Sequence, residues 1–149
     1  MKKLFAILVA FVTTIVLANV AAADGSMAGA PRITTLSGGE EVGTAGGDSD
    51  GTGSASIRLN VGKGRVCWDI SFANIATPFA SHIHAAPAGV NGGIVVPLDP
   101  FQPGCASGVD PELVQAIIDF PEQYYVNVHN ADFPGGAIRG QLSNPGLAD

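Results

Sequence analysis

The sequence predicts an all-β fold, a β-sandwich or Greek-key barrel that carries one short helix. About seven short runs alternate apolar and polar residues or are rich in β-branched residues. Glycine-rich turns separate these runs in a chain that holds 20 glycines among 149 residues. One further run has helical spacing. We therefore expect strands packed face to face around a single apolar core.

The first strand candidate, Arg32 to Leu36, stands in a region dominated by glycine, alanine, serine and threonine. We expect it to be an edge strand. The connection that follows, Gly43 to Gly53, carries Asp48 and Asp50, and spaced acidic residues beside glycine can bind calcium. The downstream glutamate of a calcium-binding loop is missing, so a flexible hairpin connection is the prediction here.

The clearest strand signal is a hairpin in the middle of the chain. Every second residue from Ala55 to Val61 is apolar, and Gly62-Lys63-Gly64 makes the turn. The next run, Arg65 to Phe72, places Trp68 on its apolar face and Cys67 on its polar face. We expect the apolar faces of both strands to look inward.

Four more strand candidates and one helix complete the predicted fold. The strands are Ala80–Ala85, Gly93–Leu98, Tyr124–His129 and Ala137–Leu142. For the helix, Asp110 is a good N-cap, Pro111 stands at the first helical position and Pro121 stops it. The buried face of the helix is expected to consist of Leu113, Val114, Ile117 and Ile118.

A tight turn is predicted ahead of the Gly93–Leu98 strand. Its residues Gly89, Asn91, Gly92 and Gly93 are types that tolerate a left-handed backbone. We expect these positions to need positive φ, so their role is conformational.

Residues 1–23 have the layout of a secretory signal peptide. Lys2 and Lys3 precede an apolar run from Leu4 to Leu17, and the segment ends in Ala21-Ala22-Ala23. An uncleaved membrane anchor is the alternative, but polar residues interrupt a run that is already short of the roughly 20 apolar residues of a span. Cleavage before Asp24 predicts a protein that is secreted or periplasmic.

The predicted mature chain has one domain. Residues 24–32 are expected to form a flexible N-terminal segment, residues 33–142 the domain and residues 143–149 a C-terminal tail. Loss of the two signal lysines leaves 5 basic residues against 13 acidic ones, a net charge of −8. Such a surface repels nucleic-acid phosphates and anionic lipid headgroups, so neither nucleic acid nor a membrane is an expected partner.

Cys67 and Cys105 are the only cysteines. In a secreted chain an isolated pair most simply forms one disulfide. The rival interpretation makes them metal ligands or a redox pair, but their spacing is not that of a C-x-x-C motif. We therefore predict a structural bridge between them.

All three histidines of the chain fall in strand candidates, at positions 82, 84 and 129. Residues i and i+2 of a strand point to the same side, so His82 and His84 can offer two imidazoles to one point. The same period puts Tyr125, Asn127 and His129 on one face. If the two strands are neighbours, a three-histidine metal site forms. In the alternative account, His82 and His84 only hydrogen-bond carbonyls of the Pro87–Gly93 loop, and His129 satisfies a strand end.

Four motifs, in order along the chain, carry a family resemblance. They are His82-Ile83-His84, Gly89-x-Asn91-Gly92-Gly93-Ile94-Val95-Val96-x-Leu98, Tyr125-Val126-Asn127-Val128-His129 and Pro134-Gly135-Gly136-Ala137-Ile138-Arg139-Gly140-Gln141-Leu142. Together they resemble the CHRD domain, which is named after chordin and also occurs in many bacterial secreted proteins. The resemblance implies an immunoglobulin-like β-sandwich with limited similarity to copper/zinc superoxide dismutase. It implies no defined activity.

The dismutase similarity suggests roles for particular residues. His82 and His84 look like the H-x-H pair of its copper site, His129 looks like its late copper histidine, and Arg139 is similar to the arginine that draws the anionic substrate toward copper. No fourth histidine is present to bridge two metals, and the zinc loop has no counterpart. The resemblance therefore implies at most a mononuclear site.

Copper is the favoured metal and zinc the alternative, because three imidazoles without thiolate or carboxylate suit both. With copper, a redox role and a small anionic partner are expected. With zinc, a bound water of lowered pKa would suit hydrolysis. The second functional hypothesis is a non-enzymatic extracellular module that binds a protein or matrix component without metal. The sequence leaves open whether the protein is an enzyme.

The sequence also indicates roles for Arg139 and for the paired glutamates. An arginine on the polar face of a terminal strand is most often solvated or paired with a carboxylate, for which Asp69 and Asp132 are the candidates near Arg139. Glu40 and Glu41 are neighbours whose side chains diverge, so they do not form a glycosidase pair. No G-x-S-x-G elbow, phosphate-cradling loop or free cysteine nucleophile is present.

Overall fold

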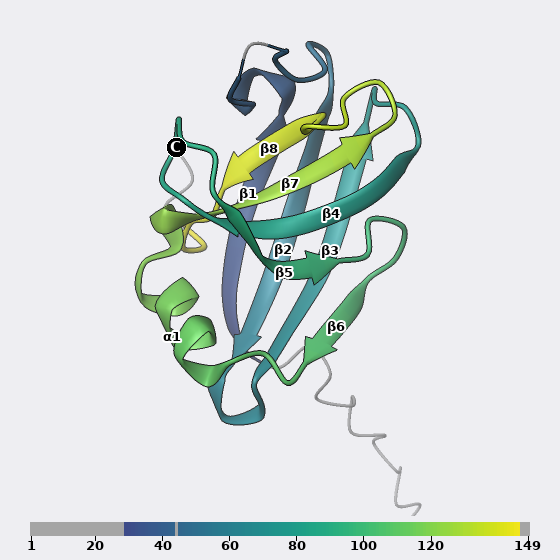
Figure 1. Cartoon of the computed structure of the whole chain (residues 1–149). Coiled ribbons are helices and arrows are strands. Elements are labelled where there is room, and N and C mark those ends of the chain that lie inside the picture. The colour runs from purple at the N-terminus through teal and green to yellow at the C-terminus, as the bar shows by residue number, and fades with distance from the viewer. Residues whose placement is uncertain (1–28, 44, 147–149) are drawn as a thin grey trace, which may run out of the picture.

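The computed structural model describes residues 29–43 and 45–146, and these form one antiparallel sheet with a short helix at its end (Figure 1). The order of strands in the sheet is β5-β4-β7-β8-β1-β2-β3-β6. The predicted signal peptide, residues 1–23, lies outside the described residues. No helix in the described part of the chain is long and apolar enough to cross a membrane.

Eight strands, one α-helix and three 3-10 turns make up the described structure. The strands are β1 Ala30–Ser37, β2 Thr52–Asn60, β3 Arg65–Ala73, β4 Pro78–Ala85, β5 Gly93–Leu98, β6 Gly104–Ser107, β7 Tyr124–Asn130 and β8 Ile138–Gln141. The helix is α1 Pro111–Asp119, and the 3-10 turns are η2 Gly38–Glu40, η3 Val61–Lys63 and η4 Pro121–Gln123. The all-β class with one helix is as the sequence predicted.

The sheet folds over on itself into two layers. Figure 1 shows β8, β7, β4 and β5 crossing in front of β1, β2 and β3. The two end strands of the sheet, β5 and β6, also contact each other, so the sandwich is close to a barrel. This arrangement buries one face of each layer against the other and leaves the second face of each layer to be covered by loops or water.

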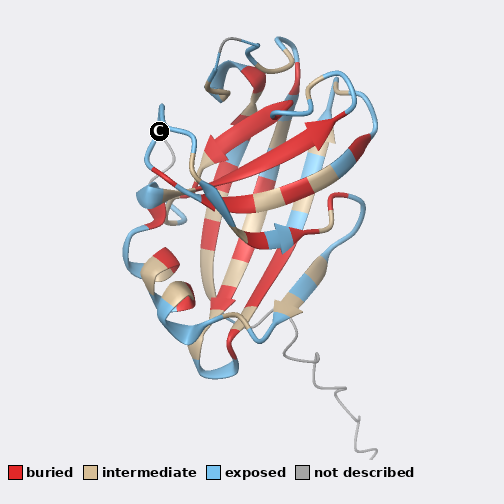
Figure 2. Cartoon of the chain, in the orientation of Figure 1, coloured by how far each residue is buried: buried red, intermediate tan, exposed pale blue. Residues whose placement is uncertain are grey.

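The core lies between the two layers and is apolar. Fully buried residues come from both, among them Ile57 and Val66 from one layer and Ile83, Val126 and Ile138 from the other. Figure 2 shows the resulting bands of buried residues along the strands. In β7 every residue from Tyr125 to Asn130 is buried, so this strand is covered on both faces.

The helix closes one end of the sandwich. Asp110 caps it by accepting a hydrogen bond from Glu112 N at 2.9 Å, as predicted. Val114 and Ile117 are fully buried in the core, and α1 contacts β2 and η3. The N-cap and the apolar stripe therefore act together to fix the helix on the end of the core.

The central hairpin is confirmed, with β2 and β3 paired along their whole length. Its turn is η3 followed by Gly64 at φ 52°. The prediction of an edge strand for Arg32–Leu36 is wrong, because β1 lies inside the sheet between β8 and β2. Strand β1 also begins at Ala30, so part of the expected flexible segment 24–32 is in the sheet.

The bridge between Cys67 and Cys105 is present and defines a strand that the sequence pattern did not predict. The two cysteines are directly paired between β3 and the edge strand β6. Strand β6 has four residues, Gly104 to Ser107, with no apolar alternation. Its place in the sheet rests on backbone pairing and on the disulfide.

Candidate metal centre

One face of the β4-β7-β8 layer is polar, and it holds all three histidines. Cross-strand pairing sets His82 opposite Asn127 and His84 opposite Tyr125. On the other side of β7, Asn127 pairs with Arg139. Directly paired residues of antiparallel strands point to the same side of the sheet, so these side chains share one face. The opposite face of the same strands carries Ile83, Val126 and Ile138 into the core.

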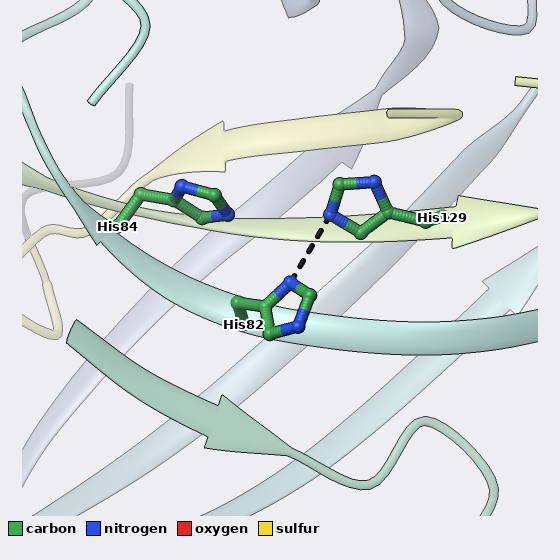
Figure 3. Close-up of side chains that lie close together, drawn as sticks. All are labelled: His82, His84 and His129. Atoms are coloured by element: carbon green, nitrogen blue, oxygen red, sulfur yellow. Dashed lines mark hydrogen bonds between the residues drawn. The ribbon is translucent and has the colours of Figure 1, made fainter. Parts of the chain in front are cut away.

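The three imidazoles lie close together, as the strand periods and this pairing require. His82 Nδ1 lies 3.2 Å from His129 Nε2. One ligand nitrogen from each of the three rings lies within 4.8 Å of the others. Figure 3 shows the rings of His84 and His129 on either side of His82, with nitrogens facing the space between them. The structure thus brings together the residues that the sequence predicted as a metal site.

Two backbone carbonyls determine which ring nitrogen of His84 and of His129 carries the proton. His84 Nδ1 lies 3.0 Å from Gly92 O, and His129 Nδ1 lies 3.1 Å from Pro134 O. A carbonyl oxygen only accepts hydrogen bonds, so both Nδ1 atoms carry the proton and donate it. In neutral imidazole the other nitrogen then holds a lone pair. Both Nε2 atoms therefore carry the lone pair that a metal ligand requires, and the one of His129 accepts a hydrogen bond from His82 Nδ1.

His84 Nε2 is buried and has no hydrogen-bond partner among the described residues. Buried polar atoms are rarely left unpaired, because the lost hydrogen bond with water is not replaced. Two nitrogens bound to one tetrahedral ion at about 2.0–2.1 Å lie about 3.3–3.4 Å apart, close to the 3.2 Å between His82 and His129. The donor set fits a transition-metal ion.

Burial keeps the histidines uncharged. The pKa of His82 falls from 6.5 to about 4, mainly because burial disfavours the imidazolium, with His129 and His84 adding to the effect. Burial also lowers the pKa of His84 and of His129, although the carbonyls of Gly92 and Pro134 partly oppose it. An imidazolium has no free lone pair, whereas a neutral imidazole has one that can bind a metal ion. Protons therefore do not block these nitrogens at neutral pH.

The account in which the histidines only satisfy carbonyls is correct in part. His84 does bond a carbonyl of the Pro87–Gly93 loop, at Gly92. His82 instead contacts another histidine, and His129 bonds Pro134 after its own strand has ended. Carbonyl bonding uses one nitrogen of His84 and one of His129, and it leaves the buried Nε2 of His84 unexplained.

Arg139 has a different environment from the one its strand position suggested. Its side chain is 1% exposed, so it is not solvated. The guanidinium donates to Asn91 Oδ1, Pro87 O and Val90 O. The predicted pairing with Asp69 or Asp132 is wrong, since the carboxylate whose charge acts on Arg139 is that of Glu41. The role of Arg139 in steering anions stays a prediction.

Glu41 is a residue of this face that the sequence did not point to. Its Oε2 accepts a hydrogen bond from Asn127 Nδ2 at 3.2 Å, and its Oε1 is buried without a partner. Burial raises its pKa from 4.5 to about 7, while Arg139 and Asn127 act in the opposite direction. The residue comes from the loop after β1, and a glutamate in a polar loop gives no sign that it will fold back onto a sheet.

The turn predicted ahead of β5 is present, but its backbone differs from the prediction. A hydrogen bond from Val90 N to Pro87 O closes it, and Gly89 has φ 75°. Asn91, Gly92 and Gly93 do not have positive φ. Gly92 is instead required by space, since a Cβ there would lie 2.1 Å from Ala85 O.

The histidine cluster is close to the protein surface. His82 is only partly buried, and the ring of Phe79, which is 58% exposed, stacks on His129 with centroids 6.4 Å apart. A groove of about 640 Å³ lies elsewhere, over β1, β2 and β3, and is lined mainly by serine and threonine. None of the histidines lines that groove. The histidine cluster and this groove are therefore separate features of the surface.

The comparison with known proteins agrees with the motifs. The family model of the CHRD domain, an extracellular-type domain, matches residues 33–142. No curated protein and no solved structure matches the chain significantly. Because the family match covers most of the chain and includes all three histidines, the protein belongs to the CHRD domain family.

Proposed function

We propose that this CHRD-domain protein binds one transition-metal ion through His82, His84 and His129. The observation that carries the proposal is the buried Nε2 of His84, which faces the other two rings and has no hydrogen-bond partner within residues 29–43 and 45–146. The carbonyls of Gly92 and Pro134 support it, because they hold two of the three rings in the ligand tautomer.

Copper is the metal we favour. Sites of nitrogen ligands bind Cu²⁺ more tightly than the other divalent first-row ions, and three imidazoles leave a coordination position open. Zinc is the alternative for the same donor set. Bound copper would supply one-electron redox chemistry, which is the basis for proposing a redox-related role.

Three features of the cluster and its surroundings support metal binding in this proposal. The two carbonyls orient the lone pairs of His84 and His129, and the burial that lowers their pKa keeps the rings unprotonated. Partly exposed His82 leaves a path from solvent to the cluster. A small anion is the ligand we propose for the open coordination position of the bound metal.

We also propose that the mature protein is secreted or periplasmic. The charge and apolar pattern of residues 1–23 support export, and the disulfide suits an oxidising compartment.

A second candidate function is a binding module that needs no metal. In the part of the chain that the structure describes, five large apolar side chains are about half or more exposed, namely Phe79, Val90, Ile94, Phe101 and Phe120. Exposed aromatic and aliphatic groups are typical of protein interaction surfaces. The partner in this case is an extracellular protein or matrix component.

A metal titration distinguishes the two candidates. The mature chain from Asp24, oxidised and stripped with chelator, is titrated calorimetrically with copper and with zinc. The control is the variant in which all three histidines are replaced by alanine, with its fold verified by circular dichroism. One equivalent bound only by the parent is the expected result, and the tighter metal identifies the ion. Equal, weak binding by both proteins would contradict the metal proposal and leave the binding module.

A further inference from the structure

Arg139 is the largest of the fully buried side chains in the described chain. A buried guanidinium is costly unless its donors are hydrogen-bonded, so the partners of Arg139 indicate what it stabilises. It extends from β8 on the histidine face of the sheet, in register with Asn127.

All three hydrogen bonds of the Arg139 side chain go to the loop between β4 and β5. Val90 O lies 2.9 Å from Nη2, Pro87 O lies 3.2 Å from Nη2, and Asn91 Oδ1 lies 3.2 Å from Nη1. A planar guanidinium offers several donors in a fixed fork, which an ammonium group cannot reproduce. Arg139 therefore holds the loop at three points.

The residue that follows these three points is Gly92, and it contacts the metal centre directly. Gly92 O accepts a hydrogen bond from His84 Nδ1, with 3.0 Å between the two atoms. Gly92 N donates to the hydroxyl of Tyr125 at 3.2 Å. The backbone of this one residue thus determines the tautomer of His84 and also contacts the hydroxyl of Tyr125.

A second set of contacts joins Arg139 to the same histidine. The guanidinium carbon lies 3.4 Å from the centroid of the Tyr125 ring. The Tyr125 ring in turn stacks on His84, with centroids 4.8 Å apart and planes 9° from parallel. His84 and Arg139 come from the two strands that flank β7, so Tyr125 is contacted from both sides of its strand.

We propose that Arg139 is a positioning residue for the His84 ligand. Through the loop it places the carbonyl of Gly92 that keeps the proton on Nδ1, and through Tyr125 it fixes the plane of the imidazole. Both effects leave the Nε2 lone pair directed at the cluster. This role differs from anion steering, because the guanidinium is buried and its donors already have acceptors within the fold.

The inference rests on the proposed function only where the Nε2 lone pair of His84 is said to bind a metal, since Arg139 positions the ring with or without metal. It is therefore tested first on metal-free protein. Histidine ring nitrogens are observed by ¹⁵N NMR at pH 8 in the parent, in Arg139→Gln and in Arg139→Lys. We expect His84 to be a single Nδ1–H tautomer in the parent and a mixture in both variants. The glutamine removes the charge and the lysine keeps it, so a parent-like lysine variant would contradict the role of the fork.

Copper affinity is the second measurement, made by competition with a chelator of known affinity. Loss of a group that orients a metal ligand without touching the metal typically weakens metal binding about 10- to 100-fold. We expect a loss of this size for both Arg139 variants. The matched control is Arg58→Gln, which removes an arginine from β2 in the other layer. Its affinity should equal that of the parent.

A third variant keeps the test decisive if the Arg139 variants do not fold. Asn91 is exposed and provides one of the three loop contacts, so Asn91→Ala should fold and shift the His84 tautomer in the same direction, by less. An unchanged tautomer in the folded variants would overturn the inference. If the parent bound no metal, the proposed function would fail while the tautomer result still decided the role of Arg139.

Discussion

Glu41 Oε2 lies 3.2 Å from Asn127 Nδ2, although 86 residues separate the two in the chain. This contact folds the loop after β1 onto the polar face of the sheet, two positions along β7 from His129. Gly136 has no side chain to interfere, since a Cβ there would lie 2.5 Å from either carboxylate oxygen of Glu41. The loop carries a buried carboxyl group into the surroundings of the histidine cluster.

Replacement of Glu41 by glutamine should change how stability depends on pH. The pKa of Glu41 is 4.5 when unperturbed and about 7 in the folded protein, so the folded state binds more protons between these values. The free energy of unfolding that the protonated Glu41 contributes is fully present below pH 4.5 and is lost as pH rises through about 7. Urea denaturation from pH 4.5 to 8 should show Glu41→Gln gaining stability relative to the parent as pH rises.

The exposed neighbour provides the control for this measurement. Glu40→Gln removes the same formal charge from the same loop without changing the buried carboxyl group. A pH-dependent difference for Glu41→Gln no larger than that for Glu40→Gln would show that the burial of Glu41 has no energetic consequence.

Metal should stabilise the parent protein and not His84→Ala. At a free copper concentration 100-fold above Kd, binding to the folded state adds about 2.7 kcal/mol to the free energy of unfolding. His84→Ala removes one of the three proposed ligands, so copper should leave the melting temperature of this variant unchanged. Thermal melts with copper and with excess chelator measure both effects.

The same melts test the account without metal. His84 stacks on Tyr125 and bonds Gly92, so the chelated variant should be less stable by about 1–3 kcal/mol. A much larger loss in chelator, together with no effect of copper on the parent, would indicate that His84 serves only the fold.

Gly92→Ala should disturb the site through the backbone. The added Cβ would lie 2.1 Å from Ala85 O, which is a backbone atom, so the chain must shift. We expect a loss of about 1–3 kcal/mol in stability and weaker copper binding, because the carbonyl that orients His84 moves. Denaturant melts and chelator competition give the two values.

Gly93→Ala is the matched control, because a Cβ at Gly93 meets no atom within 4 Å and its φ is not positive. It should be nearly neutral in both measurements. If the two alanine variants behaved alike, close approach of the backbone at residue 92 would not be what positions this loop.

Removal of the disulfide should lower stability and leave metal affinity intact. The bridge closes a loop with a sequence separation of 38, for which the chain-entropy model gives about 4 kcal/mol as an upper value. The double variant Cys67→Ala/Cys105→Ala should lose about 2–4 kcal/mol in denaturant melts. Its copper affinity should match that of the parent, since β3 and β6 lie in the layer without histidines. A matching loss of affinity would mean that the two layers are coupled.

The histidine cluster was predictable from two short strands because their geometry is local. An extended backbone alternates sides, so His82 and His84 must share a face, as must Asn127 and His129. The prediction still needed β4 and β7 to be neighbours, and no local pattern states that. Only the pairing of the two strands in the sheet brings a ligand nitrogen of each ring within 4.8 Å of the others.

The surroundings of the cluster were not predictable in the same way. The alternation of polar and apolar residues in its strand places Arg139 on a face expected to be solvated. The side chain is nevertheless 1% exposed, because two loops cover that face. One loop arrives from β1 with Glu41 and the other from β4 with Asn91, and Asn91 Nδ2 joins them by donating to Val42 O at 2.9 Å. Loops of polar residues follow no period, so their final position depends on the surfaces they meet.

By itself, the sequence determined the fold class, most of the strands, the capped helix, the disulfide partners and which histidines share a face. Each of these depends on backbone geometry over a few residues or on there being only two cysteines. The tertiary structure alone decided the order of strands, the short strand β6, the burial of Arg139 and the carboxyl group of Glu41. These depend on contacts between distant segments, where the favourable arrangement is set by packing and by the need to pair buried polar groups.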